Sequence, residues 1–210
     1  MQSYLQDYPD EALDFLKQKD RRLACVIEQI GRVEWRVYPN LFESVVFNIV
    51  GQQLSNIVGD RIWKRLKEAV PIEPETLAGT EPQTLRNLGM SMRKAEYIVD
   101  FANKVRSGEF SLEALREMSD EEAIKALCRL RGIGHWTAEM LLLGSLARPD
   151  ILSFDDYGIR KGMCMVYGHK EMDRKRFERY RKRLSPHGSI AAFYFWAVAG
   201  GAIPELEAKK

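Results

Sequence analysis

The chain has few cysteines, few histidines and no motif of closely spaced metal ligands, and each shortage excludes a class of protein. Only three of its 210 residues are cysteine, at Cys25, Cys128 and Cys164, and no two have C-x-x-C spacing. Three scattered cysteines cannot supply a four-cysteine zinc or iron–sulfur site, and an odd number does not favour a disulfide-held fold. The three histidines lack the spacing of zinc ligands, so a catalytic zinc is not expected.

The sequence also has few features typical of membrane-spanning segments or of β-strands. No apolar run reaches the roughly 18 residues that a membrane span needs, and the longest candidate, 190–203, is better interpreted as a buried helix. The first residues lack the basic-then-apolar order of a signal peptide. Alternation typical of a strand occurs only at 33–37. We therefore expect no membrane partner, a reducing cytoplasmic compartment and little β-structure.

What the sequence does contain is helical periodicity along nearly its whole length. Apolar residues recur at three- and four-residue intervals in many segments, and glycine or proline separates them. The predicted fold class is therefore all-α. The expected helices are 10–18, 23–30, 41–51, 56–69, 74–78, 81–87, 92–107, 111–117, 120–130, 135–146, 157–167, 174–184 and 189–200.

The charge is small overall but uneven along the chain. The net charge is +2, whereas 160–183 holds ten Lys/Arg against three Asp/Glu, a local +7. Such asymmetry is typical of a basic face that contacts phosphates. A solvated basic helix explains the charge equally well.

A glycine hairpin joins two expected helices at about 130–136, in the string Leu-Arg-Gly-Ile-Gly-His-Trp-Thr-Ala that begins at Leu130. Gly132 and Gly134 permit a sharp turn because glycine adopts positive φ freely. The following helix then begins at His135, and its first N–H groups favour a phosphate. Taken alone, the two glycines also fit a plain tight connection between helices.

This string resembles the helix-hairpin-helix of the helix-hairpin-helix DNA glycosylase superfamily. The continuation Ala-Arg-Pro-Asp-Ile-Leu-Ser-Phe-Asp-Asp-Tyr at 147–157 and the Gly-Gln-Gln-Leu-Ser at 51–55 resemble two further family segments. Within the superfamily the chain is most similar to the 3-methyladenine DNA glycosylase II, or alkylpurine, branch. The resemblance implies two helical lobes, 1–40 with 147–210 and 41–146, and a cleft between them that binds DNA and the target base.

Two departures narrow the activity that the resemblance implies. Bifunctional relatives carry a nucleophilic lysine two residues after the second hairpin glycine, where this chain has Trp136, and indole cannot replace it. The four-cysteine cluster of other relatives is absent, because no cysteine follows Cys164. The implied enzyme is therefore monofunctional, releasing a base by hydrolysis. A third departure concerns the substrate, because the segment before the last helix, 185–189, lacks the arginine that is frequent in the alkylpurine branch.

The resemblance aligns Asp156, the second of an Asp-Asp pair, with the catalytic aspartate. A carboxylate near the anomeric carbon stabilises the positive charge that develops on deoxyribose, and it positions water. A purine alkylated at N3 or N7 is cationic and leaves as a neutral base. Asp155 is expected to cap the next helix or to support Asp156, since aspartate before a helix is a common N-cap.

The resemblance also places the base pocket and the residue that fills the gap left by an extruded base. We expect Gln53, or otherwise Leu54, to insert into the stack, although core packing is the alternative for Leu54. Aromatic faces suit a cationic purine through stacking and cation–π attraction. The pocket candidates are Trp136, Tyr157, Trp35, Tyr38 and His187, whereas Trp63 and Trp196 lie in apolar helices and are expected in the core.

The remaining expectations concern phosphate, ions and alternatives. No cofactor is expected to be required, and a structural Na⁺ or K⁺ is implied at the carbonyls of Cys128, Leu130 and Ile133. The expected partner is double-stranded DNA carrying an alkylated purine, bound by a monomer in the cytoplasm, at the nucleoid or in a nucleus. Another target base (uracil, mismatched thymine or an oxidised purine) and a noncatalytic DNA-binding module stay open. The expected phosphate-binding residues are Gly132, Ile133, Gly134, His135 and Thr137.

Overall fold

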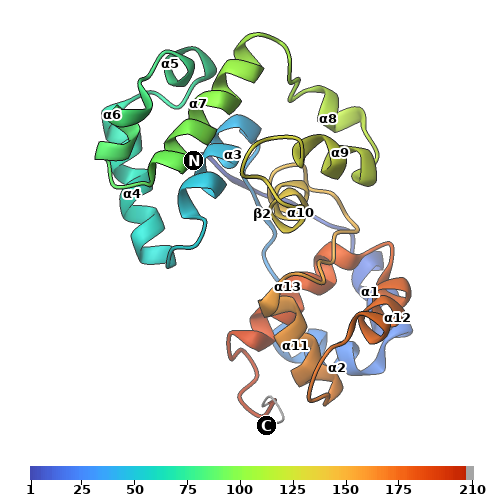
Figure 1. Cartoon of the computed structure of the whole chain (residues 1–210). Coiled ribbons are helices and arrows are strands. Elements are labelled where there is room, and N and C mark those ends of the chain that lie inside the picture. The colour runs from blue at the N-terminus through green and yellow to red at the C-terminus, as the bar shows by residue number, and fades with distance from the viewer. Residues whose placement is uncertain (207–210) are drawn as a thin grey trace. The chain divides into compact units, whose positions relative to one another are not determined.

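The computed structural model describes residues 1–206 and is almost entirely helical (Figure 1). The predicted all-α class is confirmed. The last four residues of the predicted segment 147–210 lie outside the described residues. The helices are α1 (Asp10–Lys19), α2 (Arg21–Ile30), α3 (Leu41–Gly51), α4 (Asn56–Ala69), α5 (Pro74–Ala78), α6 (Pro82–Asn87), α7 (Met92–Arg106), α8 (Ala114–Glu117), α9 (Asp120–Leu127), α10 (His135–Gly144), α11 (Tyr157–Tyr167), α12 (Arg174–Leu184) and α13 (Gly188–Ala199).

The chain divides into two compact units. Unit 1 contains Met1–Ser3 and Tyr38–Leu146, and unit 2 contains Tyr4–Val37 and the chain from Ala147 onward. The lobes that the sequence predicts are 41–146, and 1–40 together with 147–210. No helix within residues 1–206 has both the length and the apolar character that a bilayer span demands.

Unit 1 is built around α3, which is nearly continuous in apolar residues and is buried along most of its length. α4, α7 and α10 pack against it, while α5 and α6 pack on α7 (Figure 1). Phe42 of α3 stacks on Phe101 of α7, with ring centroids 5.0 Å apart. Such ring pairs are among the largest buried surfaces available to a core. The site elements of unit 1, α10 and the end of α3, therefore rest on one shared core.

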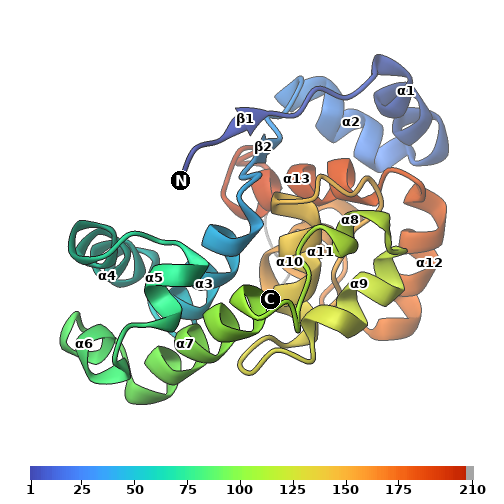
Figure 2. The same ribbon diagram turned by 90° about the horizontal axis from the view of Figure 1, so that it is seen from above.

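Unit 2 combines both ends of the chain. α11 and α13 pack together along their length, α2 packs against both, and α1 packs on α2 and α12. A two-residue antiparallel pair, β1 (Tyr4–Leu5) with β2 (Arg36–Val37), adds the strand that the weak alternation at 33–37 suggested (Figure 2). The α11–α13 contact is close at Gly162. A Cβ built there lies 2.0 Å from the carbonyl oxygen of Phe195.

A buried carboxylate joins the two ends of the chain within unit 2. Asp20 is only 3% exposed, and its Oδ1 accepts the backbone N–H groups of Arg22 and Leu23, which caps α2. Its Oδ2 accepts from the Tyr167 hydroxyl at 3.1 Å and from Arg183 at 2.8 Å. Burial raises the pKa of Tyr167 well above its ordinary value, so the phenol stays a neutral donor. A buried charge is tolerated when it is paired and hydrogen-bonded in this way.

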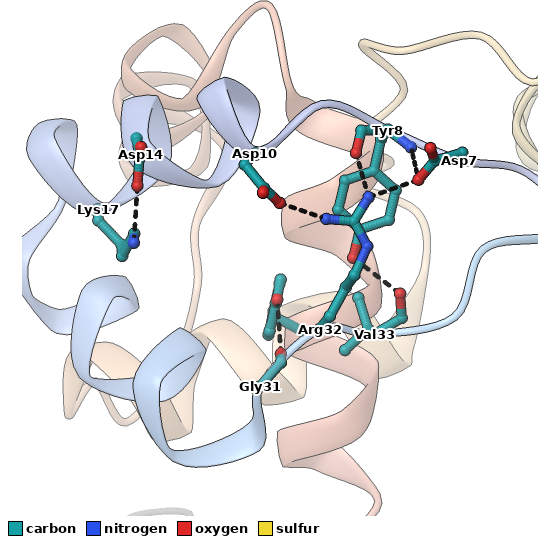
Figure 3. A network of polar contacts seen from close by, with 9 residues as sticks. Asp7, Tyr8, Asp10, Asp14, Lys17, Gly31, Arg32 and Val33 are labelled. Atoms are coloured by element: carbon teal, nitrogen blue, oxygen red, sulfur yellow. Dashed lines mark hydrogen bonds and ion pairs between the residues drawn. The ribbon is translucent and has the colours of Figure 1, made fainter.

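A second polar cluster fastens the segment before α1 to the turn after α2 (Figure 3). The Arg32 guanidinium lies over the Tyr8 ring, 4.1 Å from its centroid, and pairs with Asp7 and Asp10 at 2.7 Å each. It also donates to the Tyr8 carbonyl. The Tyr8 hydroxyl donates to the Val33 carbonyl at 2.7 Å. These contacts join the chain that follows β1 to the chain that precedes β2.

Candidate functional site

The hairpin of unit 1 needs glycine at one position for two separate reasons. Gly132 has φ +84°, and a Cβ there would lie 2.3 Å from the ring of Tyr97 on α7. Gly134, in contrast, is extended (φ −95°, ψ 174°) and serves as the N-cap of α10. Nothing lies within 4 Å of a Cβ built on Gly134. Only Gly132 therefore uses the left-handed freedom predicted for both glycines, and Gly134 leaves open space in front of α10.

The residues predicted to bind phosphate differ in what they can offer. The Ile133 N–H donates within the hairpin to the Leu130 carbonyl at 3.1 Å. The Thr137 side chain is buried, whereas His135 is exposed with Nδ1 3.4 Å from a Glu139 carboxylate oxygen. The first N–H groups of a helix have no intrahelical acceptor, so α10 offers its N-terminus to an anion through backbone alone.

The turn that follows α3 is held against this hairpin. Gln52 ends α3, and its side-chain Nε2 donates to the Gly132 carbonyl at 2.6 Å. Gln53 comes next with φ +57°, a left-handed backbone that costs a non-glycine residue about 1–3 kcal/mol. Leu54 is 37% exposed. The predicted inserting residues thus lie on a strained turn at the surface, and Leu54 is not in the core.

A lysine of α7 secures the same turn. Lys94 Nζ donates to the carbonyls of Val50 in the last turn of α3 (2.9 Å) and of the C-cap residue Gln52 (2.5 Å). A cation at a helix C-terminus interacts favourably with the dipole. Desolvation by burial lowers the pKa of Lys94. Sequence reasoning missed this residue, because a lysine near the start of an amphipathic helix looks like ordinary surface.

Trp136 and the predicted inserting residues line one pocket. It measures about 520 Å³ and lies between the end of α3, the start of α4 and the first turn of α10. Trp136 is 42% exposed, so part of its indole lies at the surface. The pocket walls include Phe47, Asn48, Gln52, Gln53, Leu54 and Trp136.

In unit 2, Asp156 is the N-cap of α11. It is 7% exposed, and its Oδ1 accepts both the Ile159 N–H at 2.8 Å and the indole Nε1–H of Trp196 at 2.9 Å. Gly158 leaves room for that indole, since a Cβ there would lie 2.8 Å from the ring. Two donors from different helices therefore fix the orientation of this carboxylate.

Two sequence-based expectations are corrected here. Asp155 does not cap α11; it is exposed and pairs with Arg174 at 3.6 Å, because Asp156 itself occupies the cap position. Trp196 is not simply a core residue, since its N–H reaches Asp156 from α13, 40 residues away. No local pattern signals a contact at that separation, which only the α11–α13 packing creates.

The other aromatic candidates differ in their surroundings. In unit 2, Trp35 is buried with its ring 5.8 Å from that of Phe193, whereas Tyr157 is 72% exposed. His187 is half-buried, and burial lowers its pKa, so the ring is neutral at pH 7. Tyr38 belongs to unit 1, where its N–H donates to the Gly144 carbonyl.

The basic segment 160–183 is only partly available to a ligand. Arg183 is engaged with Asp20, Arg176 with Asp173, and Lys161 with the carbonyl of Ala199. Lys175, Arg179 and Lys182 are exposed on α12. Part of the charge is therefore used within the protein, and the expected contact with phosphates stays a prediction. Within residues 1–206, no three His, Cys, Asp or Glu side chains are arranged to hold a metal ion.

The sequence is similar to those of curated proteins. One curated Bacillus subtilis relative is 36% identical to this chain, over 59% of this chain and 44% of its own length. A second Bacillus subtilis relative is 32% identical, over 76% of this chain and 57% of its own length. The second is named DNA-3-methyladenine glycosylase. The chain thus spans about half the length of these relatives.

Two solved structures match nearly the whole fold. The DNA-3-methyladenine glycosidase of Bacillus halodurans has a TM-score of 0.83 at 35% identity, over 98% of this chain and 95% of its own. The Schizosaccharomyces pombe 3-methyladenine DNA glycosylase, solved in complex with abasic DNA, has a TM-score of 0.79 at 26% identity, over 90% and 97%. The family described as HhH-GPD superfamily base excision DNA repair protein matches residues 46–187. The chain therefore belongs to the HhH-GPD superfamily of base excision DNA repair proteins.

Proposed function

We propose that this protein is a monofunctional DNA glycosylase that extrudes alkylated purines, of the 3-methyladenine and 7-methylguanine type, from duplex DNA and hydrolyses their glycosidic bond. The observation that carries the proposal is Asp156, a nearly buried carboxylate whose Oδ1 is held by the Ile159 N–H and the Trp196 indole. The names of the relatives support the choice of alkylated purines.

The chemistry needs little from the protein beyond charge and position. As the C1′–N bond breaks, its electron pair goes to the cationic purine, which departs neutral. Positive charge develops on the sugar, and the Asp156 carboxylate stabilises it. Water then adds to C1′, and its proton passes to the carboxylate or to solvent. The products are a free base and an abasic site.

Extrusion of the base is the task of unit 1 in this proposal. The N-terminus of α10 binds a phosphate without reading sequence, as a scanning enzyme requires. Gln53, on its left-handed turn, fills the vacated space, and Leu54 beside it adds apolar contact. Trp136 offers an exposed indole face at the same pocket. In unit 2, the exposed cations of α12 add phosphate contacts.

The proposal is tested by incubating the protein with methylated duplex DNA and identifying the released bases. We expect 3-methyladenine and 7-methylguanine to appear with an equal number of intact abasic sites. Strand breaks should form only after later alkaline treatment, because Trp136 stands where a lyase would need lysine. Release of uracil or an oxidised purine from matching substrates, without methylpurine release, would reassign the target base. No release of any base would leave a DNA-binding module.

We also propose a bound Na⁺ or K⁺ at the carbonyls of Cys128, Leu130 and Ile133. Carbonyl oxygens are hard donors that suit such cations. The Leu130 carbonyl retains a lone pair after it accepts the Ile133 N–H. At equal ionic strength, we expect DNA to bind several-fold more weakly in tetramethylammonium chloride than in potassium chloride. Equal affinity in the two salts would contradict a bound cation.

A further inference from the structure

One face of α7 carries the two side chains that support both surface loops of unit 1. Lys94 and Tyr97 are three residues apart, so they project from the same side of the helix. Lys94 reaches the turn after α3, while the Tyr97 ring lies directly under Gly132 in the hairpin. The Arg131 guanidinium lies 5.2 Å from the same ring. The helix thus sets the separation of the two loops.

The two loops are also joined to each other, through Gln52. Its backbone carbonyl accepts from Lys94, and its side-chain amide donates to the Gly132 carbonyl, 80 residues away. The contacts form one continuous chain, from Lys94 through Gln52 to Gly132. Gln53 is the next residue after Gln52, so the position of its left-handed backbone depends on this chain.

The cation at position 94 is not explained by charge pairing. Among residues 1–206, no carboxylate lies within ion-pair distance of Lys94, whereas Lys104 on the same helix pairs with Asp100 and Glu109. The Lys94 ammonium is instead directed at two neutral carbonyls and is partly desolvated. Withdrawing a charge from water without a counter-charge is unfavourable, so the two carbonyl acceptors at the end of α3 are what compensate the Lys94 ammonium.

We propose that Lys94 is a positioning residue that fixes the inserting turn to the phosphate-binding hairpin through Gln52, so that the two loops meet DNA as one rigid surface. The inference rests on the proposed function for the role of the turn. Lys94 does not touch the substrate in this scheme. It acts by holding Gln53 where insertion requires it, and therefore it affects damaged DNA more than intact DNA.

The test measures insertion directly, without base release. The probe is a duplex with a tetrahydrofuran abasic analogue beside 2-aminopurine, whose fluorescence rises when the neighbouring stack is opened. We expect Lys94→Met to lose most of the fluorescence rise and to bind this duplex about tenfold more weakly, a typical loss for a charge-assisted contact. Affinity for undamaged duplex should stay within about twofold, because the α10 N-terminus is unchanged.

Three further variants make the result specific. Lys94→Arg keeps donors for both carbonyls and should recover most of the fluorescence rise. Lys104→Met, on the same helix, should behave as wild type. Gln52→Met removes the side-chain hydrogen bond to Gly132 but keeps the backbone carbonyl that accepts from Lys94, and it should reproduce the Lys94→Met defect. If circular dichroism shows that Lys94→Met does not fold, Gln52→Met provides the test of the positioning role.

The outcomes separate this inference from the proposed function. If Lys94→Met and Gln52→Met both keep the wild-type fluorescence rise, or lose affinity equally for damaged and intact duplex, the positioning role is wrong. If wild type releases no base but the fluorescence rise still depends on Lys94 and Gln52, the proposed function fails and the positioning role stands.

Discussion

Asp156→Asn should lose base release by about 10²–10³-fold, the cost of removing one group that stabilises transition-state charge. The amide is uncharged and cannot stabilise positive charge on the sugar. Its oxygen still accepts the Ile159 N–H and the Trp196 indole, and asparagine is as good an N-cap as aspartate. Thermal stability and affinity for abasic DNA should therefore change little. Single-turnover release from methylated DNA, with the melting temperature measured in parallel, gives both quantities.

Two companion variants separate charge from orientation. Asp155→Asn removes the neighbouring carboxylate, which is exposed and pairs with Arg174, and should retain nearly full activity. Trp196→Phe keeps an aromatic ring but removes the indole N–H, so activity should fall by about tenfold, the value of one hydrogen bond to a charged group. Equal release by Asp156→Asn and wild type would mean that Asp156 serves only as a helix cap.

Gly162→Ala should destabilise unit 2 by about 3 kcal/mol, the upper end of ordinary overpacking. The added Cβ would lie 2.0, 2.6 and 2.8 Å from the carbonyl oxygen, carbonyl carbon and Cα of Phe195. All three are backbone atoms, so no side-chain rotation relieves the clash, and α11 must move away from α13. For a chain of this size we expect the melting temperature to fall by roughly 6–12 °C.

Gly144→Ala is the matched control for this substitution. Gly144 also lies in a helix, but nothing is within 4 Å of a Cβ built there. Alanine should therefore be neutral or stabilise by up to about 1 kcal/mol through helix propensity. Thermal and urea unfolding of both variants make the comparison. An unchanged midpoint for Gly162→Ala would show that the helices do not approach so closely in solution.

Helix positions were predictable because periodicity and caps are local. The start of α10 at His135 and both ends of α4 and α11 match the expected ranges. Helix ends next to tight turns were less accurate: α9 ends at Leu127 instead of 130, and α8 begins at Ala114 instead of 111. At both places the neighbouring residue, Glu113 or Cys128, still has αR backbone angles, because helix ends grade into turns over one or two residues.

The candidate site was predictable only where it is continuous in sequence. The hairpin, Gln53 and Asp156 carry recognisable strings, and the structure adds what holds each of them. Trp196 reaches Asp156 across 40 residues, and Gln52 reaches Gly132 across 80. Lys94 acts through backbone carbonyls, which have no residue signature. Contacts of this kind depend on how helices pack, and a single sequence does not encode them locally.

The buried carboxylate of Asp20 also constrains the order in which the chain folds during synthesis. Its partners Tyr167 and Arg183 lie 147 and 163 residues downstream, so the first two helices leave the ribosome long before these two donors. The intervening segment 38–146 forms nearly all of a compact unit by itself and has no such delay. Domains generally fold as units as they emerge. We therefore expect the middle of the polypeptide to fold before the unit that joins its two ends.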